Sequence, residues 1–306
     1  MLRSLLLWCA QNQWLATHVP RWGFVRRATL RFMPGDAFDA ALGAAIGFKA
    51  QGVGAVFTQL GENINLLSEA LAVVEHYESV LVTAASAGVD PEISVKPTQL
   101  GLDIDPGAAF MNLERLARSA FDVKGFLWVD MEGSAYTDAT LELYSRLLHD
   151  HAHVGVCLQA YLYRTAADVA RLIPLKPAIR LVKGAYAEPA DRAFPAKVDV
   201  DANYLALCAL LLPEVKRHKL RLVMGTHDVP LINRVTRFGD ALGVERGSLE
   251  VHMLYGIQYA QQVRLVGDGY RVKDLIAYGD AWYPWYLRRL AERPANVLFV
   301  ARQLFK

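Results

Sequence analysis

The chain has 306 residues, of which 53% are hydrophobic and 21% charged, a composition that fits a soluble globular protein with a large core. A formal net charge of +2 gives no indication of electrostatic binding to nucleic acid. The three cysteines, Cys9, Cys157 and Cys208, show no CxxC spacing, so neither a disulfide framework nor a thiolate zinc site is indicated. A reducing cytoplasm is the simplest compartment.

The N-terminus resembles a signal peptide only faintly. Its apolar stretch over residues 5–10 is short and ends in Gln11, Asn12 and Gln13 without a clear cleavage site. We expect residues 1–48 to form a helical segment, with helices at Val25–Phe32 and Ala37–Phe48, that packs on a domain spanning residues 49–306. No apolar run reaches the ~18 residues that a membrane span needs. A mean hydropathy of +0.17 allows peripheral contact with a membrane, including the inner membrane, without requiring it.

One unit then repeats along the chain: a short apolar run, a break at Gly, Asp or Pro, and a longer stretch with helical spacing. The predicted strands are Ala55–Leu60, Ile93–Lys96, Phe126–Asp130, Val154–Gln159, Ile179–Lys183, Arg221–Met224, Leu249–Leu254 and Tyr270–Ile276. The helical patterns between them include Leu66–Ala87, Leu113–Phe121, Ala139–His149 and Tyr204–Arg217. Most strands are nearly continuous in apolar residues, as parallel strands covered on both faces are.

This repeat predicts an α/β fold of the (β/α)8 TIM-barrel type with extra N-terminal helices, because eight such units over about 250 residues match that barrel better than an open sheet. The chain has no GxGxxG fingerprint and no GxxxxGK[ST] loop. Active sites of this fold lie at the C-terminal ends of the strands, so the residues at those ends are the candidates for chemistry.

Six of the eight predicted strands end in polar residues. These ends are Gly61-Glu62-Asn63, Lys96-Pro97-Thr98-Gln99, Asp130-Met131-Glu132, Gln159, Lys183-Gly184-Ala185-Tyr186 and Thr226-His227-Asp228. Any single charge among them is as readily explained by solvation or by a structural ion pair, such as Glu62 with an arginine or Asp130 with Lys96. Six polar ends that converge on one rim indicate a functional site.

The last helix carries Arg288, Arg289 and Glu292 among aromatic residues. Arg288 and Glu292 have the i,i+4 spacing of a weak surface ion pair. At a barrel mouth, however, two adjacent guanidiniums beside aromatic rings suit the capture of a carboxylate or phosphate. The run from His149 to His153 imitates a metal cluster, but it precedes the fourth strand at the opposite end of the barrel. No metal site is predicted, because no zinc spacing occurs.

Several segments together resemble bacterial monofunctional proline dehydrogenase. They are Ile93-Ser94-Val95-Lys96, Trp128-Val129-Asp130-Met131-Glu132, Leu158-Gln159-Ala160-Tyr161-Leu162, Arg180-Leu181-Val182-Lys183-Gly184-Ala185-Tyr186, Thr226-His227-Asp228 and Tyr286-Leu287-Arg288-Arg289-Leu290-Ala291-Glu292-Arg293. The resemblance runs from Leu60 to the C-terminus in the order of the family. The fifth-strand segment and the Arg-Arg-Leu-x-Glu segment are specific together and weak alone.

The resemblance implies that FAD oxidises L-proline to 1-pyrroline-5-carboxylate by hydride transfer and that electrons pass to a quinone, with a 1-pyrroline-5-carboxylate dehydrogenase as a candidate partner. It implies catalytic roles for Asp130 and Arg180. Substrate binding would involve Lys96, Arg288, Arg289, Tyr186, Leu254 and Leu275. Contacts to FAD would come from Met131, Gln159, Arg180, Val182, Lys183, Gly184, Ala185, Thr226 and His227. Glu62 and Glu292 would serve as a gate or in ion pairs.

One position departs from the family pattern. Many members carry a tyrosine on strand eight whose ring packs near C4 of proline, and a gap-free count back from Arg288 puts Leu275 there. Tyr278 is expected just past the strand. The lost hydroxyl loosens the pocket near C4, so hydroxyproline or another proline analogue is an alternative substrate. A non-catalytic binding barrel without flavin is the alternative of a different class.

Overall fold

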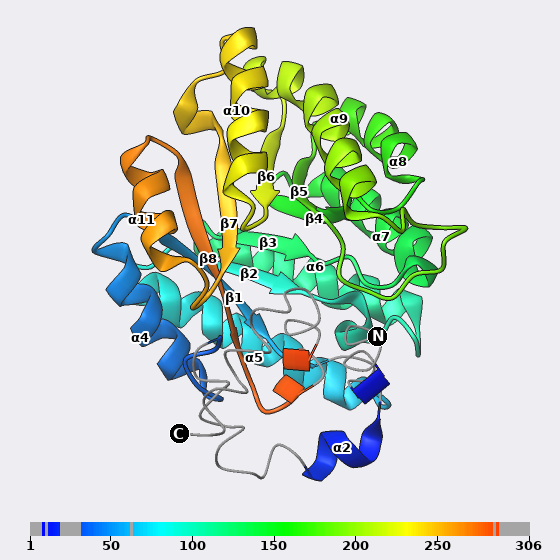
Figure 1. Cartoon of the computed structure of the whole chain (residues 1–306). Coiled ribbons are helices and arrows are strands. Elements are labelled where there is room, and N and C mark those ends of the chain that lie inside the picture. Colours follow the sequence, from blue (N-terminus) through cyan, green and yellow to red (C-terminus); the bar gives the residue numbers. More distant parts are fainter. Residues whose placement is uncertain (1–7, 10–11, 19–31, 62–63, 284–285, 288–306) are drawn as a thin grey trace, which may run out of the picture.

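The computed structural model describes residues 8–9, 12–18, 32–61, 64–283 and 286–287. Its centre is a closed barrel in which eight strands pair in sequence order, every pair parallel (Figure 1). The strands are β1 (Gly54–Gln59), β2 (Glu92–Val95), β3 (Phe126–Val129), β4 (Val154–Gln159), β5 (Ala178–Val182), β6 (Arg221–Gly225), β7 (Glu250–Leu254) and β8 (Arg271–Tyr278). The predicted (β/α)8 barrel is confirmed, with strand ends within two residues of those expected.

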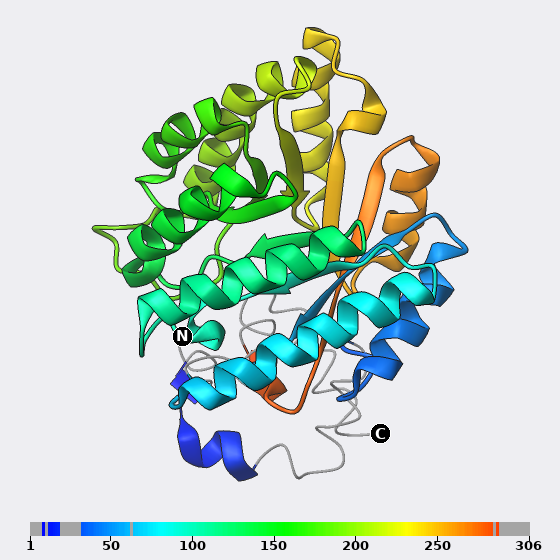
Figure 2. The same ribbon diagram turned by 180° about the vertical axis from the view of Figure 1, so that it is seen from behind.

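Helices surround the barrel, as both ribbon views show (Figures 1 and 2). They are α4 (Phe38–Lys49), α5 (Leu67–Ser86), α6 (Pro106–Asp122), α7 (Thr137–Asp150), α8 (Thr165–Leu172), α9 (Lys197–Lys216), α10 (Val229–Leu242) and α11 (Tyr259–Gly267). The neighbours α5 and α6 pack side by side, and so do α9 and α10 (Figure 2). Each buries an apolar face against the strands, which forms the main core of the molecule.

The helix α4 lies ahead of the barrel in sequence and packs against β1 and β8. It matches the predicted helix Ala37–Phe48. The other N-terminal helix, predicted at Val25–Phe32, falls outside the described residues apart from Phe32. A short helix, α2 (Gln13–His18), precedes it. The division of the chain at residue 48 stays a prediction. No helix of the described residues is long and apolar enough to cross a membrane.

Alternate residues along the strands point into the barrel and out toward the helices. Val56, Trp128, Val223 and Leu275, from four different strands, share one cluster inside the barrel. Because side chains alternate, Tyr278 lies on the opposite face from Leu275. The prediction that Tyr278 lies just past the strand is wrong. It is the last residue of β8, is buried, and packs outside the barrel, with its hydroxyl 2.8 Å from Nε2 of His76 on α5.

Candidate active site

The inner residues at the C-terminal ends of the strands build the candidate site. Lys96 follows β2 directly, Asp130 follows β3, Gln159 ends β4, and Thr226 follows β6. Lys96, Gln159 and Thr226 are all buried, which is unusual for lysine and glutamine side chains. The structure thus brings these four polar strand ends to one mouth of the barrel, as the sequence predicts.

An ion pair between the end of β3 and β5 lies at this mouth, with Arg180 buried and Asp130 partly exposed. Arg180 on β5 forms a salt bridge with Asp130, and its Nη2 also donates a hydrogen bond to Oγ of Ser94 at 2.7 Å. Burial alone would lower the pKa of Arg180, but the adjacent Asp130 carboxylate raises it overall, so the guanidinium stays charged. The other terminal nitrogen, Nη1, is buried and has no hydrogen-bond partner among the described residues. A fixed cation with a free donor can bind an electron-rich group of a ligand.

Gln159 joins the end of β4 to the loop after β3. Its Nε2 donates to the carbonyl oxygens of Met131 at 3.3 Å and Glu132 at 3.2 Å. Its Oε1 is buried without a partner among the residues that the structure describes. Glu132 is held in turn by the backbone N–H (3.1 Å) and the hydroxyl (2.6 Å) of Thr98. These contacts fix the backbone around Met131 and leave one buried acceptor for a ligand.

Lys183, directly after β5, lies between two carboxylates. Its Nζ is 2.5 Å from Oδ1 of Asp201 on α9 and 2.7 Å from Oδ2 of Asp228 at the start of α10. Burial opposes ionisation of both aspartates, but the contact with Lys183 lowers the pKa of each. The sequence does not predict the contact of Asp201 with Lys183, because Asp201 lies within a helix and nothing in the local sequence distinguishes it.

Two further contacts shape the rim. Nε2 of His227 accepts a hydrogen bond from the backbone N–H of Leu254 at 3.2 Å, which joins the ends of β6 and β7. Gly184 has a φ of +112°, and a Cβ there would lie 2.2 Å from the ring of Tyr161. Only glycine fits this position, and the immediate reason is the Tyr161 ring. Ala185 and Tyr186 follow in the same half-buried loop.

The two leucines expected in the substrate pocket are neighbours. Leu254 on β7 and Leu275 on β8 are register partners, and the side chain of Leu275 packs with Val56 and Val223 inside the barrel. The position predicted to depart from the family pattern therefore does point into the barrel. It presents a branched aliphatic side chain without a hydroxyl.

Four of the predicted site residues lie outside the described part of the chain: Glu62, Arg288, Arg289 and Glu292. Their placement stays a prediction.

Beside His227, a cleft of about 540 Å³ opens between the starts of α10 and α11, lined by His227, Asp228, Val229, Pro230, Gln258, Gln261 and Arg264. The mouth of the barrel thus combines a buried cation, polar atoms unpartnered among the described residues, and an apolar wall, which are features of a small-molecule site.

Comparisons with known proteins identify the family of the chain. The model of the family "Proline dehydrogenase" matches residues 41–302. Proline dehydrogenase of Deinococcus radiodurans is 36% identical over 281 residues, which cover 90% of this chain and 89% of that protein. Proline dehydrogenase 2 of Bacillus subtilis strain 168 is 32% identical over 304 residues, 99% of each chain.

Solved structures show the same fold at lower identity. A structure of proline utilization A (PutA) from Bdellovibrio bacteriovorus, inactivated by N-propargylglycine, superposes with a TM-score of 0.82 at 21% identity. The superposition covers 94% of this chain but only 38% of that longer protein. A PutA mutant structure from Bradyrhizobium japonicum gives a TM-score of 0.75 at 22% identity, with 91% and 32% covered. On the family match and the full-length relatives, the chain belongs to the proline dehydrogenase family and is an enzyme that oxidises proline.

Proposed function

We propose that this enzyme oxidises L-proline to 1-pyrroline-5-carboxylate with FAD, by hydride transfer from the substrate, and passes the electrons to a quinone. Proline dehydrogenases generally depend on a flavin. The observation that carries the proposal is the buried Arg180, paired with Asp130, with Nη1 of Arg180 and Oε1 of Gln159 buried and unpartnered among the described residues at the same mouth. A ligand with donors and acceptors on one planar edge would satisfy both atoms.

The residues at the ends of β3 to β6 fit this cofactor. We assign FAD contacts to Met131, Gln159, Arg180, Val182, Lys183, Gly184, Ala185, Thr226 and His227. When bound, FAD supplies the hydride acceptor. Arg180 is suited to stabilise negative charge beside it, because the guanidinium is already paired with Asp130 and does not have to reorganise.

The substrate is assigned to the space between the β2, β7 and β8 ends and the last helix. Lys96, Arg288 and Arg289 would clamp the carboxylate, while Tyr186, Leu254 and Leu275 would line the ring pocket. A fixed carboxylate holds the reacting carbon at near-attack distance, ~3–3.5 Å. A site rich in cations disfavours an ammonium group, so it favours the neutral amine whose lone pair drives hydride loss. Glu62 and Glu292 would pair with the arginines, and Glu62 would act as a gate.

A flavin titration tests the proposal. The purified protein should be yellow, alone or after incubation with FAD, and L-proline added without oxygen should bleach the flavin band. If the protein binds no flavin at all, the alternative of a non-catalytic binding barrel is the correct one. Bleaching by another cyclic amino acid, but not by proline, would assign a different substrate.

Leu275 favours one second candidate, a dehydrogenase of hydroxyproline or a related analogue. The side chain lies inside the barrel beside Val56 and Val223, where the family pattern has a tyrosine. A panel of proline analogues, compared by the rate of anaerobic bleaching in the wild type and in Leu275→Tyr, tests it. Tighter binding of proline in Leu275→Tyr supports the assignment of the pocket, whereas no change or a loss contradicts it.

The remaining assignments concern partners and location. We place the enzyme in the cytoplasm with peripheral contact to the inner membrane, because its proposed quinone acceptor is a membrane lipid. A 1-pyrroline-5-carboxylate dehydrogenase would remove the unstable product. Reoxidation of the bleached enzyme by a quinone analogue tests the electron acceptor. Co-sedimentation with liposomes tests the contact with the membrane. Without reoxidation by quinones, another electron acceptor must be sought.

A further inference from the structure

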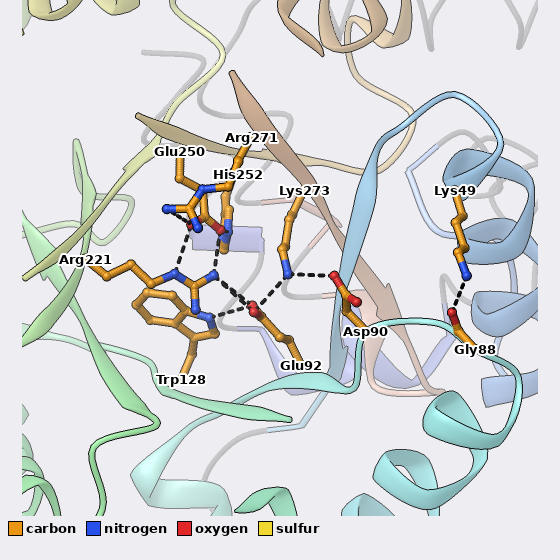
Figure 3. Close-up of polar contacts among 10 residues, drawn as sticks. All are labelled: Lys49, Gly88, Asp90, Glu92, Trp128, Arg221, Glu250, His252, Arg271 and Lys273. Carbon is orange, nitrogen blue, oxygen red and sulfur yellow. Dashed lines mark hydrogen bonds and ion pairs between the residues drawn. The ribbon is translucent and has the colours of Figure 1, made fainter. Parts of the chain in front are cut away.

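The closed end of the barrel holds a layer of buried charges that the proposed function does not use. It consists of Glu92 on β2, Arg221 on β6, Glu250 on β7 and Lys273 on β8 (Figure 3). The first three are the first residues of their strands, and Lys273 pairs with Gly54, the first residue of β1. Arg221 contacts Glu250 at 2.6 Å and Glu92 at 3.0 Å, and Lys273 contacts Glu92 at 2.9 Å. Two carboxylates thus balance two cations.

This layer is an ion network and not a metal site. Ligand atoms of Glu92, Glu250 and His252 lie within 4.8 Å of one another, the spacing that a metal ion would need. Arg221 and Lys273, however, already contact those carboxylates, so a metal ion would have to displace buried cations.

Trp128 on β3 joins this layer to the active site. Its indole is fully buried, and Nε1 donates a hydrogen bond to Oε2 of Glu92 at 3.2 Å (Figure 3). The guanidinium carbons of Arg221 and of Arg180 each lie 5.0 Å from a Trp128 ring centroid. Both distances are within the range of a cation–π contact, which is strongest where water is excluded. One side chain thus contacts the closed-end network and the active-site cation.

His252 packs against the same indole, with ring centroids 5.6 Å apart at an edge-on angle of 79°. Its Nε2 lies 2.8 Å from Oε1 of Glu250. Burial lowers the pKa of His252 to about 4, although the adjacent Glu250 carboxylate opposes this, and the nearby charge of Arg180 adds to the lowering. The imidazole is therefore neutral at pH 7 and fills the space beside Trp128 without repelling Arg180.

We propose that Trp128 is a positioning residue: its ring, anchored by Glu92, holds the Arg180 guanidinium in the orientation that proline oxidation requires. The inference rests on the proposed function, because it takes Arg180 as the cation that faces the flavin. Asp130 and Ser94 both accept from the Nη2 nitrogen of Arg180, so they hold only one edge of the guanidinium. The ring of Trp128, 5.0 Å from the guanidinium carbon, supplies a second support.

Three variants of the flavin-loaded enzyme test this role. Trp128→Phe keeps an aromatic ring but loses the hydrogen bond to Glu92, and Trp128→Leu loses both. Phe57→Leu is the matched control, since Phe57 is an equally buried aromatic residue on a barrel strand that packs in the outer core, away from Arg180. The readouts are kcat and KM for proline, the thermal midpoint, and the reduction potential of the flavin measured by dye titration without proline.

We expect a graded loss of kcat, roughly 10-fold in Trp128→Leu and smaller in Trp128→Phe, the scale of a lost desolvated cation–π contact. The flavin potential should become more negative in the same order, because a displaced cation stabilises reduced flavin less. Phe57→Leu should lose thermal stability but keep the wild-type kcat and potential.

An unchanged flavin potential in Trp128→Phe overturns the proposal, even if Trp128→Leu does not fold. Equal kcat losses in Trp128→Leu and Phe57→Leu, with no change of potential, also overturn it and leave Trp128 a purely structural residue. These outcomes presuppose a wild type that L-proline bleaches. If the wild type is not bleached, the proposed function fails instead, so the two failures can be told apart.

Discussion

At the scale of single residues, Asp130 is the only acidic partner of Arg180 among the described residues. Asp130→Asn would leave the buried Arg180 cation with hydrogen bonds but no countercharge. Removing one partner of a fully buried pair costs ~3–5 kcal/mol, and the partial exposure of Asp130 puts this pair at the lower end of that range. We therefore expect a large fall in the free energy of unfolding, measured in urea, together with a loss of kcat. The matched control is Asp138→Asn, because Asp138 pairs with Arg164 at 2.5 Å with 80% of its side chain exposed. That exposed pair should be worth less than ~1 kcal/mol. Equal losses in the two variants would contradict the structural role assigned to Asp130.

A second residue, Asp274 on β8, should make stability depend on pH. It is fully buried, with Oδ1 accepting from Gln262 at 2.8 Å and Oδ2 unpartnered among the described residues, and burial raises its pKa from 3.8 to about 8. The folded state then keeps a proton that the unfolded chain releases above about pH 4. The contribution of Asp274 to stability is therefore greatest below that pH and is lost as pH rises toward 8, by ~1.4 kcal/mol per unit.

Asp274→Asn removes this titration and keeps an acceptor for Gln262. The free energy of unfolding of the wild type, minus that of the variant, should fall between pH 5 and pH 8 and level off above. Urea unfolding at four pH values measures it. A constant difference across that range would mean that Asp274 is ionised in the folded protein.

At the scale of elements, one contact ties together the loops that follow β3 and β5. The carboxylate of Glu188 accepts from the backbone N–H of Ser134 at 2.7 Å and from its hydroxyl at 2.5 Å. Arg192, from the same loop as Glu188, donates to that hydroxyl at 3.1 Å. These loops carry Met131 and Tyr186, so the contact should hold the wall of the proposed substrate and cofactor pocket.

Glu188→Ala should raise KM for proline by roughly 3- to 10-fold, because a hydrogen-bonded contact that acts on the pocket only through the loops contributes ~0.6–1.4 kcal/mol. Flavin affinity, measured by fluorescence on release, should fall as well. Glu214→Ala is the control, since Glu214 forms an ion pair with Arg217 at the far end of α9. If KM is the same in both variants, the contact between the two loops does not shape the pocket.

The elements themselves were largely predictable. Parallel strands buried on both faces appear as continuous apolar runs, so all eight were found, with Val154–Gln159 matched to the residue. The helices α6 and α9 begin about two turns earlier than the apolar spacing predicts. Asp105 caps α6 through the backbone N–H groups of Gly107 and Ala108, and the first turn of α9 is mostly exposed, so neither start shows apolar spacing. Site partners such as Asp201 and Glu188 reach across loops, and local spacing carries no signal for such contacts.

At the scale of the whole molecule, the barrel below the active site is filled by an apolar cluster around Trp128 and, at its closed end, by a layer of paired charges. Arg221, Glu250 and Lys273 lie inside predicted strands, yet the apolar pattern of those strands gave no reason to expect ion pairs in the barrel interior. The barrel interior tolerates these residues because their charges are paired. Burial opposes ionisation of Glu92, but the adjacent Arg221 and Lys273 lower its pKa overall. Removing one charge of the layer should therefore destabilise the fold only when its oppositely charged partner is left in place.

That dependence gives the last prediction. Lys273→Met leaves Glu92 with one cation fewer and should cost ~3–5 kcal/mol of unfolding free energy, as the loss of one partner of a buried pair does. Lys49→Met is the matched control, because Lys49 is exposed and contacts only the carbonyl oxygen of Gly88 among the described residues (Figure 3). The double variant Lys273→Met with Glu92→Gln makes the layer neutral again and keeps hydrogen-bonding groups for Arg221 and Trp128. It should therefore be more stable than Lys273→Met alone in urea unfolding. If the double variant is less stable than the single one, charge balance is not what holds the closed end of the barrel together, and the hydrogen bonds of Glu92 must be.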